Sequence, residues 1–156
     1  MSTFSSSTTA EAVVPVERDR VWEVLTDPDL VARFTPFIAK ISVQGDDHWI
    51  WHMSGLQVLG KGFSATFTER MTLEEGKRIE FTHDPPQGAK ERAGVHGWYA
   101  LADHPRGVML ETSMEICVDL PLPKISGGAV RTTMRGVINQ MGDRFSKNLL
   151  AHLGVS

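Results

Sequence analysis

The sequence of 156 residues carries a formal net charge of −3 with scattered lysines and arginines, which gives no electrostatic reason to expect nucleic-acid binding. Its single cysteine cannot form an internal disulfide, and this favours a reducing, cytoplasmic location. The Ser/Thr-rich start lacks the features of a secretory signal, and no apolar run approaches the ~20 residues that span a bilayer, so we expect no stable membrane insertion. We expect a single domain over residues 1–156.

The N-terminal part of the chain predicts one strand followed by two short helices. Thr8–Val14 has the composition of a strand, and the proline that follows predicts an edge strand. Charged and apolar residues recur at helical spacing from Glu17 onwards. Asp27 before Pro28 is typical of a helix start, because aspartate caps and proline suits the first helical position. This second helix is expected to end near Pro36.

The middle of the chain alternates between two faces, with turn residues between the runs, and this predicts a series of strands. The expected strands are Ile38–Val43, His48–Met53, Gly60–Met71, Arg78–His83, Gly94–Ala102 and Val108–Val118. Glu69 is the one charge on the apolar side of its strand, and Arg70 lies on the outer side. His83 also points inward by this alternation. The irregular stretch Asp84–Glu91 is expected to form the mouth of a site.

The C-terminal segment Ala129–Leu153 predicts a long amphipathic helix. Its apolar residues form one stripe at helical spacing: Val130, Met134, Val137, Ile138, Met141, Phe145, Leu149 and Leu153. A helix of about 25 residues is roughly 37 Å long, about the width of a small domain, so it has to lie across the predicted sheet. These patterns predict an α+β domain in which one sheet holds one helix.

This order of elements resembles the helix-grip fold of the START-like, pollen-allergen-like (SRPBCC) superfamily. The residues that carry the resemblance are Val14-Pro15-Val16, Val21-Trp22-Glu23-Val24-Leu25-Thr26-Asp27-Pro28, Gly97-Trp98 and Arg144-Phe145-Ser146-Lys147-Asn148-Leu149-Leu150. The resemblance covers nearly the whole chain and is strongest to the polyketide cyclase/dehydrase and carbon-monoxide-dehydrogenase-accessory types. It implies a curved antiparallel sheet of about seven strands around the C-terminal helix, after two short helices. It also implies a cavity for a hydrophobic or aromatic small molecule.

Aromatic and methionine side chains on the predicted inner faces are candidates for contact with such a ligand. Large rings can stack on a planar molecule, and unbranched thioethers adapt to varied shapes. Ordinary core packing is the alternative for each residue. The candidate ligand-binding residues are Trp49, Trp51, Phe67, Phe81, His83, Trp98, Met114, Met134, Ile138, Met141 and Phe145.

Two ionisable residues on apolar faces are candidates for acid–base chemistry. His83 could hydrogen-bond a ligand or act on it as an acid or base, or it is a hydrogen-bonded core residue. An inward Glu69 is costly to desolvate unless it is paired or faces a wet cavity, which makes it a cavity candidate. The alternative for Glu69 is a bulge that turns it outward. The direction of His96 stays open, and we expect no metal and no organic cofactor.

Three sequence motifs that would indicate a specific chemistry are incomplete or wrongly placed. Gly55–Gly62 nearly spells a phosphate-binding loop, but its last position lacks serine or threonine and a strand follows. His48 and His52 have the spacing of a helical zinc site, yet on a strand they lie about 13 Å apart. Cys117 has no histidine near it in sequence, and no nucleophile elbow exists. Nucleophilic hydrolysis therefore has no support.

The sequence leads to one preferred function and two alternatives. We expect a carrier that binds a hydrophobic small molecule between sheet and helix. The alternative from the enzyme class is a polyketide or aromatic cyclase/dehydrase with His83 and Glu69 as acid and base. A third alternative is an accessory protein that docks on a partner enzyme or a membrane surface through an apolar patch. An all-apolar cavity favours the carrier, whereas paired polar groups inside it favour the enzyme. The ligand and the oligomeric state stay open.

Overall fold

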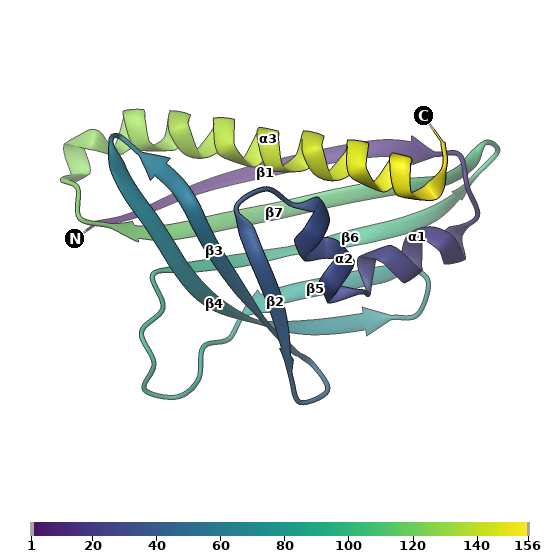
Figure 1. Cartoon of the computed structure of the whole chain (residues 1–156), viewed down its shortest axis with the longest axis horizontal. Helices are drawn as coiled ribbons and strands as arrows, with labels where there is room; N and C mark the ends of the chain where they lie inside the picture. Colours follow the sequence, from purple (N-terminus) through teal and green to yellow (C-terminus); the bar gives the residue numbers. More distant parts are fainter. Residues whose placement is uncertain (1, 156) are drawn as a thin grey trace.

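The computed structural model describes residues 2–155 and contains, within them, one seven-stranded antiparallel sheet and three α-helices. The elements are β1 (Ser2–Val14), α1 (Arg18–Leu25), α2 (Pro28–Phe34), β2 (Ile38–Gln44), β3 (His48–Val58), β4 (Lys61–Glu74), β5 (Arg78–His83), β6 (Ala93–His104), β7 (Gly107–Leu120), the short 3-10 helix η1 (Lys124–Ser126) and α3 (Gly127–Leu153). The strand order is β1-β7-β6-β5-β4-β3-β2. Figure 1 shows α3 along one side of this curved sheet. The predicted helix-grip architecture is confirmed.

The helix boundaries follow local signals in the sequence. Oδ1 of Asp27 accepts hydrogen bonds from the backbone N–H groups of Asp29 (3.0 Å) and Leu30 (3.2 Å) at the start of α2. Pro28 occupies the first helical position, where its missing N–H costs nothing. The predicted start of the second short helix is therefore confirmed.

The two short helices hold the C-terminal half of α3. The rings of Phe34 and Phe145 meet edge to face with their centroids 6.3 Å apart. Asn148 donates a hydrogen bond to the carbonyl oxygen of Phe34 (3.0 Å), and Arg20 donates one to that of Leu153 (3.0 Å). Figure 1 shows α1 and α2 at this end of the molecule. Across residues 2–155, no helix is both long and apolar enough to cross a membrane.

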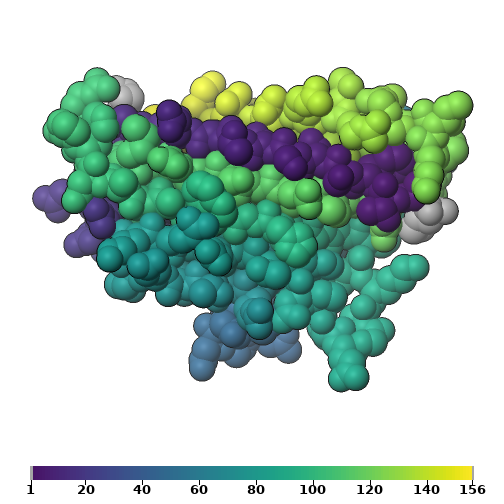
Figure 2. Space-filling view, turned by 180° about the vertical axis from the view of Figure 1, so that it is seen from behind, coloured from purple at the N-terminus to yellow at the C-terminus, as the bar shows by residue number. Residues whose placement is uncertain are grey.

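Two strand regions are longer than the sequence predicted. β1 begins at Ser2, because its serine- and threonine-rich residues pair one to one with β7, from Ser2 opposite Leu120 to Val14 opposite Val108. Polar residues suit this strand since it is an edge of the sheet, as predicted. Figure 2 shows β1 exposed along its length beside α3.

β3 extends beyond its predicted end at Met53 through Val58, and β4 begins at Lys61 and runs beyond its predicted end at Met71 to Glu74. The residues between them, Leu59 and Gly60, both have positive φ angles of 49° and 79°. This backbone is that of a two-residue hairpin turn, which glycine favours. The added length carries the hairpin tip to the N-terminal half of α3 (Figure 1). This hairpin forms one wall of the site described below.

Candidate functional site

An apolar hollow of about 40 Å³ lies between the N-terminal half of α3, the β3–β4 hairpin and the end of β7. Its walls are formed by Met53, Leu56, Val58, Phe63, Ile116, Val118, Leu120, Thr133, Met134, Val137, Ile138 and Met141. The surface that faces the hollow is wholly apolar, and no ionisable side chain lines it. A space of this size holds only a few water-sized groups, so a larger molecule has to widen it.

Three of the predicted ligand-binding residues, Met134, Ile138 and Met141, line the hollow. Leu56 and Val58 were not predicted as wall residues because the predicted strand His48–Met53 ended before them. Phe63 lies within the predicted strand Gly60–Met71 but was not among the ligand-binding candidates. The signal that could have found this hairpin was the turn dipeptide between two apolar runs. The expected mouth, the loop of residues 84–91, does not line the hollow.

The other inward-facing candidates pack in the interior around the hollow. Trp51 stacks on Phe67 with ring centroids 5.9 Å apart and planes 8° from parallel, and Trp49 contacts Trp51 at 6.1 Å. Trp51, together with Met53 and Val95, packs against both hydrophobic clusters of the core. Phe81 belongs to the cluster under the C-terminal half of α3, and Met114 and Phe145 pack against that cluster.

The expectation that Trp98 lines the cavity is wrong about its direction. Trp98 lies on the outer side of β6, where Cζ of Arg78 sits 4.5 Å from the centroid of its ring. The neighbouring Tyr99 points the other way, into the core. The period of two placed these neighbours on opposite sides correctly, but it does not say which side faces α3. His96 shares the outer side with Trp98 and is exposed.

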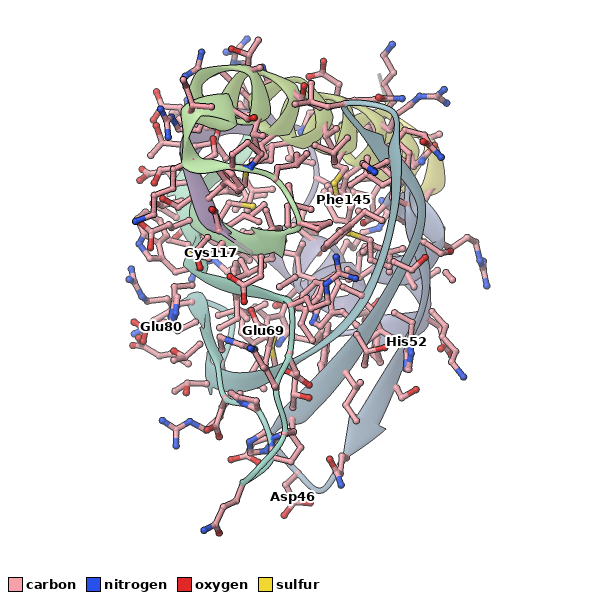
Figure 3. All side chains as sticks on the ribbon, turned by 90° about the vertical axis from the view of Figure 1, so that its left-hand side faces the viewer. Asp46, His52, Glu69, Glu80, Cys117 and Phe145 are labelled. Carbon is pink, nitrogen blue, oxygen red and sulfur yellow. The ribbon has the colours of Figure 1, made fainter. Side chains whose placement is uncertain are left out.

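Glu69 points inward, as the alternation predicted, and only 1% of its surface is exposed. Neither carboxyl oxygen makes a hydrogen bond of acceptable geometry within residues 2–155. Burial raises the pKa of Glu69 to about 9; the Val95 backbone N–H lies close enough to oppose this rise through a weak, poorly aligned hydrogen bond, and the charge of Glu91 adds to the rise. The side chain is therefore protonated and uncharged at neutral pH. Figure 3 shows Glu69 within the curve of the sheet, while Glu80 points away from its outer side.

His83 lies beside Glu69 on the neighbouring strand and is held by the loop that follows it. β5 ends at His83, opposite Glu69, so the part of β4 from Thr68 back towards Lys61 has no pairing partner on β5. Glu91 covers that edge: its carboxylate accepts hydrogen bonds from the backbone N–H (2.8 Å) and the hydroxyl (2.7 Å) of Thr68. The same carboxylate lies 2.8 Å from Nε2 of His83. A Cβ on Gly94 would lie 2.4 Å from Nδ1 of His83, so glycine makes room for the ring.

The beginning of the same loop, at Asp84, is held to β3 by a second histidine, His48, and we call this contact the His48–Asp84 tether. Nε2 of His48 lies 2.8 Å from Oδ2 of Asp84, and Nδ1 lies 2.7 Å from Oδ1 of Asp47. The hydrogen bond with Asp84 raises the pKa of His48, and His48 in turn lowers the pKa of Asp84. The tether is therefore strongest where both groups are charged, between pH 3.8 and pH 6.5, the ordinary values of the two groups.

We expect this tether to loosen as the pH rises through the raised pKa of His48, because the neutral ring no longer attracts Asp84. Hydrogen exchange of the Asp84 amide, corrected for its intrinsic rate, should be more strongly protected at pH 5.5 than at pH 8.5. His48→Gln should abolish most of this difference, whereas His96→Gln, on the exposed outer side of β6, should keep it. Equal protection at the two pH values in the unaltered protein would contradict the tether.

Residues 5–153 match the family model described as "Polyketide cyclase / dehydrase and lipid transport". No curated protein matches the sequence. The fold is similar to that of the Zhui aromatase/cyclase from Streptomyces sp. R1128, with a TM-score of 0.65, 15% identity, and coverage of 97% of this chain and 93% of that one. It is also similar to a START superfamily protein from Mycobacterium smegmatis, with a TM-score of 0.65, 13% identity and 95% coverage of both chains.

A further similar structure is the di-domain aromatase/cyclase StfQ from the steffimycin biosynthetic pathway, with a TM-score of 0.67 and 14% identity. The alignment covers 95% of this chain but spans 50% of that protein. At these identities the solved structures show a shared fold, and the family model alone carries the assignment to a family.

Proposed function

Because this chain belongs to the polyketide cyclase/dehydrase and lipid transport family, we propose that it binds and carries a hydrophobic small molecule between the sheet and α3. The observation that supports this most directly is the wholly apolar surface of the hollow. Apolar walls favour transfer of a hydrophobic molecule from water, and sites of this kind need few polar groups. The absence of an ionisable side chain from the lining favours a carrier over an enzyme.

The ligand enters, in this proposal, by separating the β3–β4 hairpin from α3. The helix packs mainly against β1 and much less against β3, so the hairpin side is the weaker of its two contacts. The turn residue Leu59 at the hairpin tip is 47% exposed, so its own side chain adds little to the apolar contact that holds the hairpin. Met53, Met134 and Met141 line the hollow, and their flexible side chains allow its walls to adapt as it widens. We further propose that the protein acts in the cytoplasm.

A filled hollow should no longer accept a ligand. We expect Val137→Phe, which adds a ring at the wall, to weaken binding of 1-anilinonaphthalene-8-sulfonate about tenfold or more, measured by the dye's fluorescence. The matched control is Asn139→Phe, which adds the same ring to the exposed side of the same helix and should leave the affinity unchanged. Thermal unfolding of both variants shows whether each is folded. If the two variants bind the dye equally well, the hollow is not the binding site.

Catalysis of the cyclase/dehydrase type is the second candidate, and one observation favours it. Glu69 and His83 are directly opposite each other on β4 and β5, and Glu91 fixes the His83 ring. A protonated carboxylic acid beside a histidine is a pair that could donate and accept protons. Burial also raises the pKa of the Cys117 thiol, which opposes a nucleophilic role for it.

The accessory-protein alternative rests on exposed apolar side chains. The large ones are Val43, Leu59, Leu73 and Ile125, which stand on four separate segments of the chain. Scattered apolar residues of this kind are normal on protein surfaces. We therefore prefer the carrier function.

A further inference from the structure

Two residues next to each other in the interior keep polar atoms without a hydrogen-bond partner within residues 2–155. These atoms are Nε1 of Trp51 and both carboxyl oxygens of Glu69. A buried polar group that makes no hydrogen bond costs about 1–3 kcal/mol, so a protein gains stability by replacing it. The indole N–H of Trp51 and the O–H of the uncharged Glu69 are therefore two buried donors that have no acceptor among these residues.

The register of the sheet places these two side chains on the same inner side of neighbouring strands. Trp51 on β3 is opposite Phe67 on β4, and Trp49 is opposite Glu69. Trp51 and Glu69 are thus diagonal neighbours, and their Cβ atoms are expected about 7–8 Å apart, within reach of long side chains. The indole of Trp51 lies flat on Phe67, and this stacking fixes its orientation.

The same inner side leads from this polar pair to the hollow. Phe63 on β4 lines the hollow, and the next inward-facing residues along this strand are Ala65, Phe67 and Glu69. Ala65 is opposite Met53, another wall residue, and lies four residues from Glu69. Four residues of strand correspond to about 13 Å, the length of an extended chain of roughly ten carbons. The alanine is the smallest side chain on this path, and both it and Met53 are only partly buried.

We propose that Trp51 and Glu69 bind the polar end of the ligand, and that the ligand is an elongated apolar molecule that carries a carbonyl group at this end. This inference rests on the proposed carrier function and names the class of ligand. Nε1 of an indole can only donate a hydrogen bond, and an uncharged carboxyl group donates one through its O–H. Two donors fit the two lone pairs of a carbonyl oxygen, whereas a ligand ammonium would leave the indole N–H without an acceptor.

The test compares two molecules of nearly the same shape that differ in one non-hydrogen atom. 2-Undecanone has a carbonyl oxygen where 2-methyl-1-undecene has a CH₂ group, so only the ketone accepts a hydrogen bond. Both are titrated against 1-anilinonaphthalene-8-sulfonate bound to the protein, and displacement of the dye gives their affinities. We expect the ketone to bind about tenfold more tightly than the alkene.

Three variants separate the two donors from the rest of the interior. Glu69→Met should reduce the ratio of the two affinities to near one while the alkene still binds. Glu69→Gln should keep part of the ketone's advantage, because its amide N–H can donate. Trp51→Phe retains a ring on Phe67 but loses the N–H, and it should also reduce the ratio. As a control, Glu115→Gln on the exposed side of β7 should leave the ratio unchanged.

The outcomes distinguish this inference from the function on which it rests. If neither molecule displaces the dye, the carrier function itself is wrong. If both displace it equally from the unaltered protein, the carrier function stands and the carbonyl site is overturned. A ketone advantage that survives in both Glu69→Met and Trp51→Phe also overturns it, because the acceptor is then bound elsewhere.

Discussion

Glu69→Gln is expected to stabilise the protein by about 3 kcal/mol at pH 7, an unusually large gain for one substitution. Unfolding exposes the carboxyl group to water and returns its pKa from about 9 to the ordinary value of 4.5. At pH 7 the unfolded chain therefore gains free energy by ionising at this group, while the folded chain does not. Glutamine has the same shape and cannot ionise, so this advantage of the unfolded state disappears.

The pH dependence of this gain has a definite sign. Because the pKa of Glu69 is higher in the folded protein than in the unfolded chain, the free-energy cost of keeping this carboxyl group uncharged in the fold is absent below pH 4.5. This cost grows by about 1.4 kcal/mol per pH unit up to pH 9. Urea unfolding of both proteins at pH 4.5 and pH 7 measures it. Glu115→Gln, an exposed carboxyl on β7, should follow the unaltered protein at both values. A gain of equal size at pH 4.5 and pH 7 would show that Glu69 does not remain protonated in the fold.

Gly97→Ala is expected to destabilise the protein by about 3 kcal/mol or more, or to prevent folding. A Cβ at this position would lie 2.2 Å from the carbonyl oxygen of Ser113 and 2.9 Å from Cα of Met114. Both atoms belong to the backbone of β7, which cannot move without disturbing its pairing with β6. The ring of Phe81 would also be only 2.8 Å away.

The matched control for Gly97 is another glycine in a strand. At Gly62 on β4 the nearest atom to an added Cβ is Nε2 of Gln57 at 3.6 Å, an ordinary contact at the end of a flexible side chain. Gly62→Ala should therefore change the unfolding free energy by less than about 0.5 kcal/mol. Thermal or urea unfolding of the two alanine variants compares them directly. Similar stabilities for both would mean that β6 and β7 do not approach as closely at Gly97 as the structure shows.

Glu69 connects the stability of the fold with the binding of the ligand. An uncharged acid whose O–H has no acceptor within residues 2–155 is costly in the fold, and a ligand carbonyl would supply that acceptor. Glu69→Gln, which stabilises the chain, is then also expected to weaken selection for the ketone in part. Residues that lower the stability of a protein but serve its binding or activity are typical of functional sites.

The sequence by itself determined the order of the elements and the sides on which many residues lie. The Asp27-Pro28 signal acts over one helical turn, so it placed the start of α2 without any tertiary information. Alternation along β4 placed Glu69 inside, and the stripe on the last helix identified Met134 and Ile138 as interior residues. These features depend on local backbone geometry, which a few neighbouring residues fix.

Only the tertiary structure decided where the hollow lies and what surrounds the ionisable residues. The side of β6 that carries Trp98 depends on which side of the sheet α3 covers, and a period of two is the same for both choices. The bonds from Glu91 to Thr68 and His83 join residues 23 and 8 positions apart, because β5 ends early and frees an edge. The size of the hollow depends on how side chains from β3, β4, β7 and α3 fill the space between them, and such packing is a property of the assembled chain.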